Sequence, residues 1–266
     1  MARDLVEAPV SLRARGTTDD VHNRLLRRLD TAGLQRLWPH LEPVALKARR
    51  MLQHAGTPMD HVYFIEAGLV SVVARTGPSK MVETWLIGRE GLVGVPAVLG
   101  QRGTAHGRLV QVDGTALRID AATMRTIMDE NAGIRRVILR YVQSILVQAS
   151  QNGACNAHHS VQQRLAKWLL VASDKCGSDV LPLAQHVLAR MLGVRRATVG
   201  ESIAVLEKSG ALGRSRSMIR IADRGRLEDA ACYCYRVVRA ATWPRLDPKP
   251  EAATPAASVD DSRRAE

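Results

Sequence analysis

Aromatic residues are scarce in this chain of 266 residues: they make up 3%, with a single phenylalanine. We therefore do not expect a surface that binds single-stranded nucleic acid by stacking bases on aromatic rings. No apolar run approaches the roughly 18 to 20 residues that a membrane-spanning helix requires, and charges follow Met1 where a signal peptide would be apolar. These absences predict a cytoplasmic protein that has no membrane partner.

Cysteine is missing from the first 154 residues, and the four cysteines of the second half do not form the spacing of a disulfide framework. Cys232 and Cys234 are too close together and too isolated to form a zinc site without further ligands. Cys155, His158 and His159 are near one another only in the sequence, which does not by itself indicate a site. We expect no metal site. Buried thiols and surface histidines are the favoured interpretation, and a thiol-based redox response is the open alternative.

Positive charge is in excess, with a net charge of +12. A polyanion is the first partner to consider, and the alternative is an arginine-rich composition without a specific partner. The excess is concentrated between residues 185 and 220. This segment contains two glutamates and seven basic residues, namely Arg190, Arg195, Arg196, Lys208, Arg214, Arg216 and Arg220. This distribution favours double-stranded DNA as the partner.

The segment from Leu183 to Gly210 has the pattern of a helix-turn-helix. Apolar residues recur at helical spacing on its first half, and Gly193 stands where a left-handed helix end is needed. Ala189 is small enough to let two helices cross closely. A second helix is expected from near Ala197, with Val199, Ile203 and Leu206 facing inward.

Before this motif the chain changes character twice. Residues 46–118 hold β-branched runs separated by glycines, which is typical of a small antiparallel barrel or jelly roll. A long helical pattern follows, in which four apolar residues step by 4, 3 and 4: Ile134, Ile138, Tyr141 and Ile145. This spacing predicts a dimer seam, and packing of the same face against the chain's own barrel is the alternative.

Ser160 and Gln163 form a capping box that starts another helix, and Gly177 ends it. After the helix-turn-helix, a basic turn between short alternating strands indicates a β-wing with Leu212, Ile219 and Ile221 inward. The predicted class is α+β. Its predicted parts are a flexible leader (1–20), a barrel sensor domain (21–122), a long dimerisation helix (123–158), a winged helix-turn-helix (159–240) and a disordered tail (244–266).

Over about residues 21 to 240 the chain resembles the Crp/Fnr family of bacterial transcription regulators. The barrel segment GTPMDHVYFIEAGLVSVVA is similar to the family's cyclic-nucleotide-binding-like domain at Gly56, Tyr63 and Gly68. The segment LPLAQHVLARMLGVRRATV, with LEKSGAL and IRIADR after it, is similar to the family's DNA-binding signature. The resemblance implies a homodimer on a palindromic operator, and contact with RNA polymerase if the protein activates transcription.

Carried onto this chain, the resemblance implies that the second motif helix enters the major groove. We expect Arg196 to read guanine, because a guanidinium can donate two parallel hydrogen bonds to O6 and N7; a solvated charge that attracts phosphate is the alternative. The full predicted DNA-binding set is Gln185, Arg195, Arg196, Thr198, Gly200, Glu201, Ser202, Arg214 and Arg216.

The chain also departs from the family pattern. Ala197 and Glu201 stand where well-studied relatives carry Glu and Arg, so the resemblance implies a different operator. Glu201 could accept a hydrogen bond from cytosine or point to solvent. Ala184 stands where a threonine N-cap is expected. The missing cap would lower the stability of the helix by about 1 kcal/mol.

In cyclic-nucleotide-binding members a Glu holds the ribose hydroxyl and an Arg neutralises the phosphate. The matching positions here are Val95 and Ala105, so we expect no tight binding of cyclic AMP. Two interpretations of the cavity are left: it binds an unknown effector, or side chains fill it. The candidate pocket residues are Val95, Arg102, Thr104, His106 and Arg108. The N-terminal cysteines of iron–sulfur members are missing, and we expect no cofactor.

These patterns predict a sequence-specific regulator of transcription. A receptor whose DNA affinity is still controlled by a cyclic nucleotide is the alternative. An enzyme is not expected and no catalytic residue is assigned, because no pair of nucleophile and base or phosphate-binding glycine loop occurs at working spacing.

Overall fold

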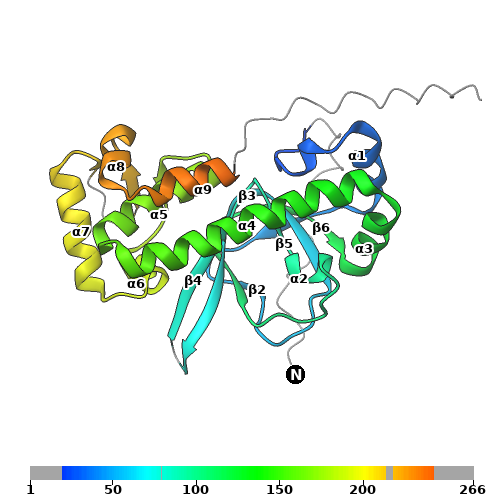
Figure 1. The fold of residues 1–266 in the computed structure, drawn as a ribbon, viewed down its shortest axis with the longest axis horizontal. Coiled ribbons are helices and arrows are strands. Elements are labelled where there is room, and N and C mark those ends of the chain that lie inside the picture. Colours follow the sequence, from blue (N-terminus) through cyan, green and yellow to red (C-terminus); the bar gives the residue numbers. More distant parts are fainter. Residues whose placement is uncertain (1–19, 79, 214–217, 243–266) are drawn as a thin grey trace, which may run out of the picture.

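The computed structural model describes residues 20–78, 80–213 and 218–242. A six-stranded sheet, antiparallel throughout, forms the first half, in the order β1-β6-β3-β4, with β2 paired to β6 and β5 to β3 (Figure 1). Its strands are β1 (Glu42–Leu46), β2 (Met51–Gln53), β3 (His61–Gly77), β4 (Lys80–Ile87), β5 (Leu92–Val93) and β6 (Gly107–Asp120).

Strand β3 is the centre of this sheet, because it pairs with β4, β5 and β6. Its pairing with β6 shifts register between Ala67 and Leu69. Gly68 lies at the shift with φ of +91°, and a Cβ there would lie 2.7 Å from the carbonyl oxygen of Val112. Only glycine fits that position, which explains the glycine of the predicted barrel pattern.

Short helices cover one end of the sheet, and a helical half follows it. The first group comprises η2 (Leu26–Arg28), α1 (Thr31–Leu37), η3 (Trp38–His40) and α2 (Val95–Val98). The later helices are α3 (Ala121–Glu130), α4 (Ala132–His158), α5 (Val161–Cys176), α6 (Gln185–Leu192), α7 (Arg196–Lys208), α8 (Arg224–Ala230) and α9 (Cys234–Thr242). A small antiparallel sheet, β7-β9-β8, joins Val180–Leu181, Ile219–Ile221 and Leu212–Gly213.

The long helix predicted over residues 123–158 is divided into α3 and α4 at Asn131. This residue leaves the helical conformation, with φ of −131° and ψ of 103°, and its side chain accepts a hydrogen bond from the Ile134 amide over 2.9 Å. Asparagine is a strong N-cap residue, so a new helix begins here. From this point α4 runs along the sheet towards the second half of the chain (Figure 1).

The predicted dimer seam is wrong in its choice of residues. Ile134, Ile138, Tyr141 and Ile145 are between 1% and 6% exposed and belong to the core beneath α3 and α4, with Phe64, Leu92 and Met124. The hydroxyl of Tyr141 also donates to the carbonyl of Leu92 over 3.1 Å. This face of α4 therefore packs on the chain's own barrel, as the alternative interpretation held.

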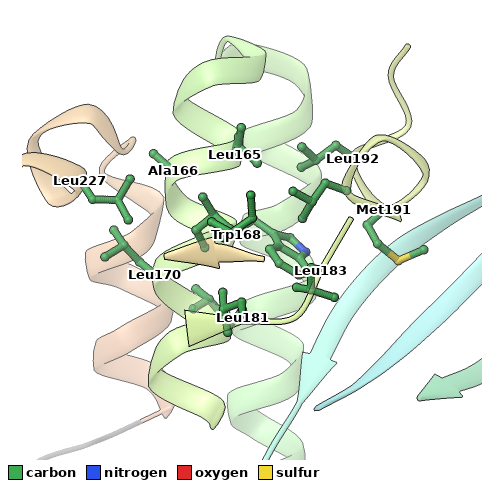
Figure 2. Packing of buried hydrophobic residues seen from close by; sticks show 14 of the residues in the cluster. Leu165, Ala166, Trp168, Leu170, Leu181, Leu183, Met191, Leu192 and Leu227 are labelled. Atoms are coloured by element: carbon green, nitrogen blue, oxygen red, sulfur yellow. The ribbon is translucent and has the colours of Figure 1, made fainter. Parts of the chain in front are cut away.

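Helix α5 is the central element of the second half. The predicted capping box of Ser160 and Gln163 is present, and Gly177 ends the helix in the left-handed conformation, with φ of 68°. The side chains of Leu165, Trp168 and Leu170 lie among those of Leu181, Leu183 and Leu192 (Figure 2). The wing residues Leu212, Ile219 and Ile221 are buried in the same core, as predicted.

The sheet and the helical half share this core. Leu69, Val73 and Leu86 of β3 and β4 belong to it. Polar contacts reinforce the junction: the buried ammonium of Lys175 on α5 pairs with the carboxylate of Glu90, and Asn152 Nδ2 on α4 donates to the Thr84 carbonyl over 2.7 Å. No helix among the described residues has a stretch both long and apolar enough to cross a bilayer.

Candidate DNA interface and effector site

The helix-turn-helix consists of α6, a three-residue turn and α7. Gly193 ends α6 with φ of 68° and ψ of 34°, the left-handed conformation that the sequence predicts. The amide of Val194 returns to the Ala189 carbonyl over 3.0 Å, and α7 begins at Arg196. Leu188 and Met191 of α6 pack with Val199, Ile203 and Leu206 of α7. The two helices are thereby fixed at the turn.

The N-terminal end of α7 is exposed. Arg195, Arg196, Ala197 and Glu201 are all on the surface. Among the described residues, neither arginine side chain makes a hydrogen bond or an ion pair; the Arg195 backbone carbonyl accepts from the Val199 amide over 3.3 Å. Helix α7 lies at the outer edge of the molecule (Figure 1). Free guanidinium groups at a helix N-terminus, which itself carries partial positive charge, suit a phosphate-lined groove.

Gln185 and Gly200 lie side by side, because a Cβ on Gly200 would be 3.6 Å from the Gln185 amide oxygen. The structure therefore brings the start of α6 next to the first turns of α7. Ala184 occupies the N-cap position of α6 and makes no side-chain capping bond, as its sequence predicts. A hydroxyl that could donate to phosphate is thus missing from this end of α6.

Ser202 does not face the groove side of α7. It is 7% exposed, and its hydroxyl donates to the Thr198 carbonyl over 2.8 Å. A serine that bonds back to the preceding turn of its own helix has no free donor for DNA. The prediction of a DNA contact at Ser202 is wrong, and Thr198 beside it is half-buried.

The described residues include only part of the wing. Arg214 and Arg216, both predicted to contact DNA, lie outside the described residues. Arg220 on β9 is exposed, as are Arg190 on α6 and Lys208 at the end of α7. Arg190 and Lys208 belong to the helix-turn-helix and Arg220 to the strand that follows it, and all three add to the positive charge of this half.

The turn between α6 and α7 contacts the barrel. A Cβ on Gly193 would lie 3.2 Å from Cγ2 of Val82 on β4, and Gln111 Nε2 donates to the sulfur of Met191 over 3.2 Å. Met191 points from α6 towards the sheet strands (Figure 2). The helix-turn-helix and the barrel are therefore in direct contact at this turn.

Three of the predicted pocket residues form one hydrogen-bonded group. Arg108 Nη1 donates to Thr104 Oγ1 over 2.6 Å and also to the His106 carbonyl, while the His106 amide donates to the same threonine oxygen over 3.2 Å. Burial lowers the pKa of Arg108 to about 10. Burial, and then the charge of Arg108, lower the pKa of His106.

The other two pocket candidates lie elsewhere. Val95 packs at the edge of the core under α3 and α4, and Arg102 is exposed. Two donors near the arginine group are unused: Arg108 Nε and Trp85 Nε1 are buried and have no hydrogen-bond partner among the described residues. The ring centroids of Trp85 and His106 are 6.3 Å apart. Unused buried donors are suited to oxygen acceptors of a small molecule.

Sequence reasoning missed a cluster of sulfur and nitrogen ligands. Cys155, His159, Cys232 and Cys234, which the sequence analysis treats as separate, meet where α4 ends and α9 begins. The signal in the sequence is the four-residue spacing of Cys155 and His159, which places both on one helix face. The 77-residue separation between Cys155 and Cys232 conceals the rest.

Two family models match the sequence, in the order of the two halves. Residues 43–131 match the cyclic nucleotide-binding domain, and residues 163–230 match the Crp-like helix-turn-helix domain. The chain belongs to the Crp/Fnr family of transcription regulators. Its recognised role is therefore that of a DNA-binding transcription regulator, as the sequence resemblance implies.

Solved structures of this family share the fold. FixK2 from Bradyrhizobium japonicum superposes with a TM-score of 0.64 at 14% identity, over 72% of this chain and 98% of that one. The c-di-GMP responsive regulator CLP from Xanthomonas campestris gives 0.60 at 16% identity, over 73% and 100%. A CRP/FNR family transcriptional regulator from Thermus thermophilus, TTHA1359, gives 0.59 at 22% identity, over 71% and 98%. A search of curated proteins found no match.

Proposed function

We propose that this Crp/Fnr regulator acts as a homodimer that binds a palindromic operator sequence-specifically, with α7 of each protomer in a major groove. The exposed N-terminal end of α7 carries the proposal: the side chains of Arg195 and Arg196 have no partner among the described residues, and Gln185 at the start of α6 lies beside Gly200 on α7. A two-fold dimer presents two such helices to successive turns of the duplex. Chromosomal DNA of a bacterium lies in the cytoplasm, so we place the protein there.

Arg196 is the proposed reader of a base, and Glu201, five residues later on α7, is the proposed partner of a cytosine amino group. Arg195 and Thr198 would contact phosphate, as would Arg214 and Arg216 of the wing. Ala197 cannot accept a hydrogen bond through its side chain, so the operator differs from those read by relatives with Glu at this position. RNA polymerase becomes a partner if the protein activates transcription.

The dimer is proposed to form through the face of α4 opposite to the predicted seam. Leu139 and Leu146 are 46% and 57% exposed on this helix. With Gln143 and Ser150, which are exposed as well, they step by 4, 3 and 4 along one face. This is the spacing of a two-helix seam, and two exposed leucines seven residues apart supply its apolar contacts.

We propose further that cyclic AMP is not the effector. Val95 offers no acceptor for a ribose hydroxyl, Ala105 offers no charge, and Arg108 already bonds Thr104 and the His106 carbonyl. The unused donors Arg108 Nε and Trp85 Nε1 favour another small molecule that carries acceptor oxygens. Calorimetry with cyclic AMP and cyclic GMP tests this. A dissociation constant in the micromolar range or tighter would contradict the proposal and support the alternative of a cyclic-nucleotide receptor.

Selection of duplexes from a random library tests the main proposal. The full chain is expected to enrich an inverted repeat whose half-sites are centred about 10 to 10.5 base pairs apart, or a multiple of that. Equal recovery of all sequences would contradict sequence-specific binding. Enrichment of a single unrepeated site would contradict the two-fold dimer alone.

A further inference from the structure

Four potential metal ligands converge where α4 meets α9. Cys155 and His159 come from the C-terminal end of α4, and Cys232 and Cys234 from the segment that enters α9. Their ligand atoms all lie within 4.8 Å of one another. The three cysteines are buried and the histidine is half-buried. The cysteines form a cluster separate from the three larger cores.

The local backbone turns all four side chains inward. The His159 amide donates to the Cys155 carbonyl over 3.1 Å, which keeps the two residues one helical turn apart on the same face. On the other side, the Tyr235 amide donates to the Cys232 carbonyl over 3.0 Å. Tyr233 between the two cysteines is 70% exposed, so its neighbours on either side are the ones that face the cluster.

The distances fit a single tetrahedral ion. Bonds of about 2.3 Å to sulfur and about 2.0 to 2.1 Å to nitrogen place neighbouring ligand atoms roughly 3.5 to 3.8 Å apart. Cys155 Sγ and Cys232 Sγ are 3.5 Å apart, and Cys234 Sγ is 3.5 Å from His159 Nδ1. A disulfide would require about 2.05 Å, and all four cysteines of the chain are free.

The surroundings suit thiolates better than apolar thiols. Gln151 Nε2 donates to Cys234 Sγ over 3.1 Å, as an outer hydrogen bond to a metal-bound sulfur would. Packing alone explains buried cysteines, but it does not explain an imidazole nitrogen and a side-chain amide donor directed at them.

We propose that Cys155, His159, Cys232 and Cys234 bind one Zn²⁺ ion in a closed tetrahedral Cys₃His site. Three thiolates and an imidazole are ligands that zinc prefers, and four protein ligands leave no open position, which is the pattern of structural sites. The ion joins α9 to the end of α4. Because α4 runs along the barrel, the site fixes the C-terminal helix of the DNA-binding half to the helix that connects it to the sensor half (Figure 1).

Metal content of the untagged full chain tests the site. We expect one zinc per chain in the wild type, and the same in Cys176→Ser, which changes the one cysteine outside the cluster. Cys234→Ser should lose most of the zinc. Chelation should lower the melting temperature of the wild type and leave that of Cys234→Ser unchanged, because metal binding stabilises only the state that has the site.

A measurement on the wild type alone covers the case in which a variant misfolds. After chelation, titration with Co²⁺ should saturate at one equivalent, with the strong visible bands of tetrahedral cobalt and thiolate-to-cobalt charge transfer. Cobalt binding without these bands, or no cobalt binding, would overturn the proposal. Equal zinc content in Cys234→Ser and the wild type would overturn it as well, as would an iron–sulfur cluster or a Cys155–Cys232 disulfide in the isolated protein. These readouts do not depend on DNA binding, so the two proposals fail separately.

Discussion

The indole Nε1 of Trp168 on α5 donates a hydrogen bond to the carboxylate Oε1 of Glu83 on β4, over 2.8 Å. The other oxygen of Glu83 accepts from the Ser71 hydroxyl over 2.6 Å. Burial raises the pKa of Glu83 and the two donors lower it by less, so the result is a pKa of about 7. A carboxyl group that titrates near neutrality thus lies at the contact between the barrel and the DNA-binding half.

Glu83→Gln should remove a pH dependence of stability. The folded state holds the Glu83 proton more tightly than the unfolded chain, so its contribution is complete at low pH and is lost as pH rises towards about 7. For the wild type we expect the free energy of unfolding to fall by up to about 3 kcal/mol between pH 5 and 8. Urea unfolding at both pH values measures it, and Asp229→Asn on α8 is the control; an equal fall in Glu83→Gln would contradict the assignment.

Lys175→Met should be strongly destabilising. The side chains of Lys175 and Glu90 are both 3% exposed, and the glutamate also accepts from the Gly88 amide over 3.1 Å. Removing the ammonium leaves a buried carboxylate without its cation, which costs about 3 to 5 kcal/mol. The double variant Lys175→Met, Glu90→Gln should lose less than the sum of the two single variants. Additive losses in denaturant unfolding would show that the two groups do not interact.

The two faces of α4 should respond differently to substitution. Leu146→Glu places a charge on the proposed dimer face, so light scattering should find a folded monomer. Ile138→Ala leaves a cavity in the core and should lower the free energy of unfolding by about 2 to 5 kcal/mol without changing the oligomeric state. If Ile138→Ala dissociates the dimer and Leu146→Glu does not, the proposed face is wrong.

Gly193→Ala should weaken the helix-turn-helix. Its φ of 68° is unfavourable for any residue with a Cβ, and the added carbon would lie 3.2 Å from Val82. We expect a loss of about 1 to 2 kcal/mol in thermal or urea unfolding. A variant as stable as the wild type would mean that the turn can relax away from β4.

Local chemistry predicted the elements whose signals lie within a few residues. Gly193, the capping box at Ser160 and the inward wing residues are of this kind, because a cap or an alternating strand is decided by its neighbours. Asn131, two positions before Gly133, also carried a local signal, because asparagine is a strong N-cap residue. The helical periodicity on both sides of it concealed the break between α3 and α4.

Long-range contacts are where the sequence was insufficient. Periodicity shows that Ile134 and Ile138 share a face of α4, but not whether a second chain or the barrel covers it. Likewise no spacing rule links Cys155 to Cys232, because their approach depends on where α9 packs. Ser202 was misassigned because a hydroxyl on a motif helix can bond backwards to its own backbone.

The most direct test of DNA reading by α7 compares Arg196→Ala with the wild type on a selected operator and on its single-base variants. We predict that the variant loses discrimination at one position of each half-site, by about 1 to 3 kcal/mol, and keeps it elsewhere. Arg236→Ala, an exposed arginine on α9, should match the wild type at every position. Equal weakening of Arg196→Ala on all sequences would contradict the account, because Arg196 would then contact only phosphate.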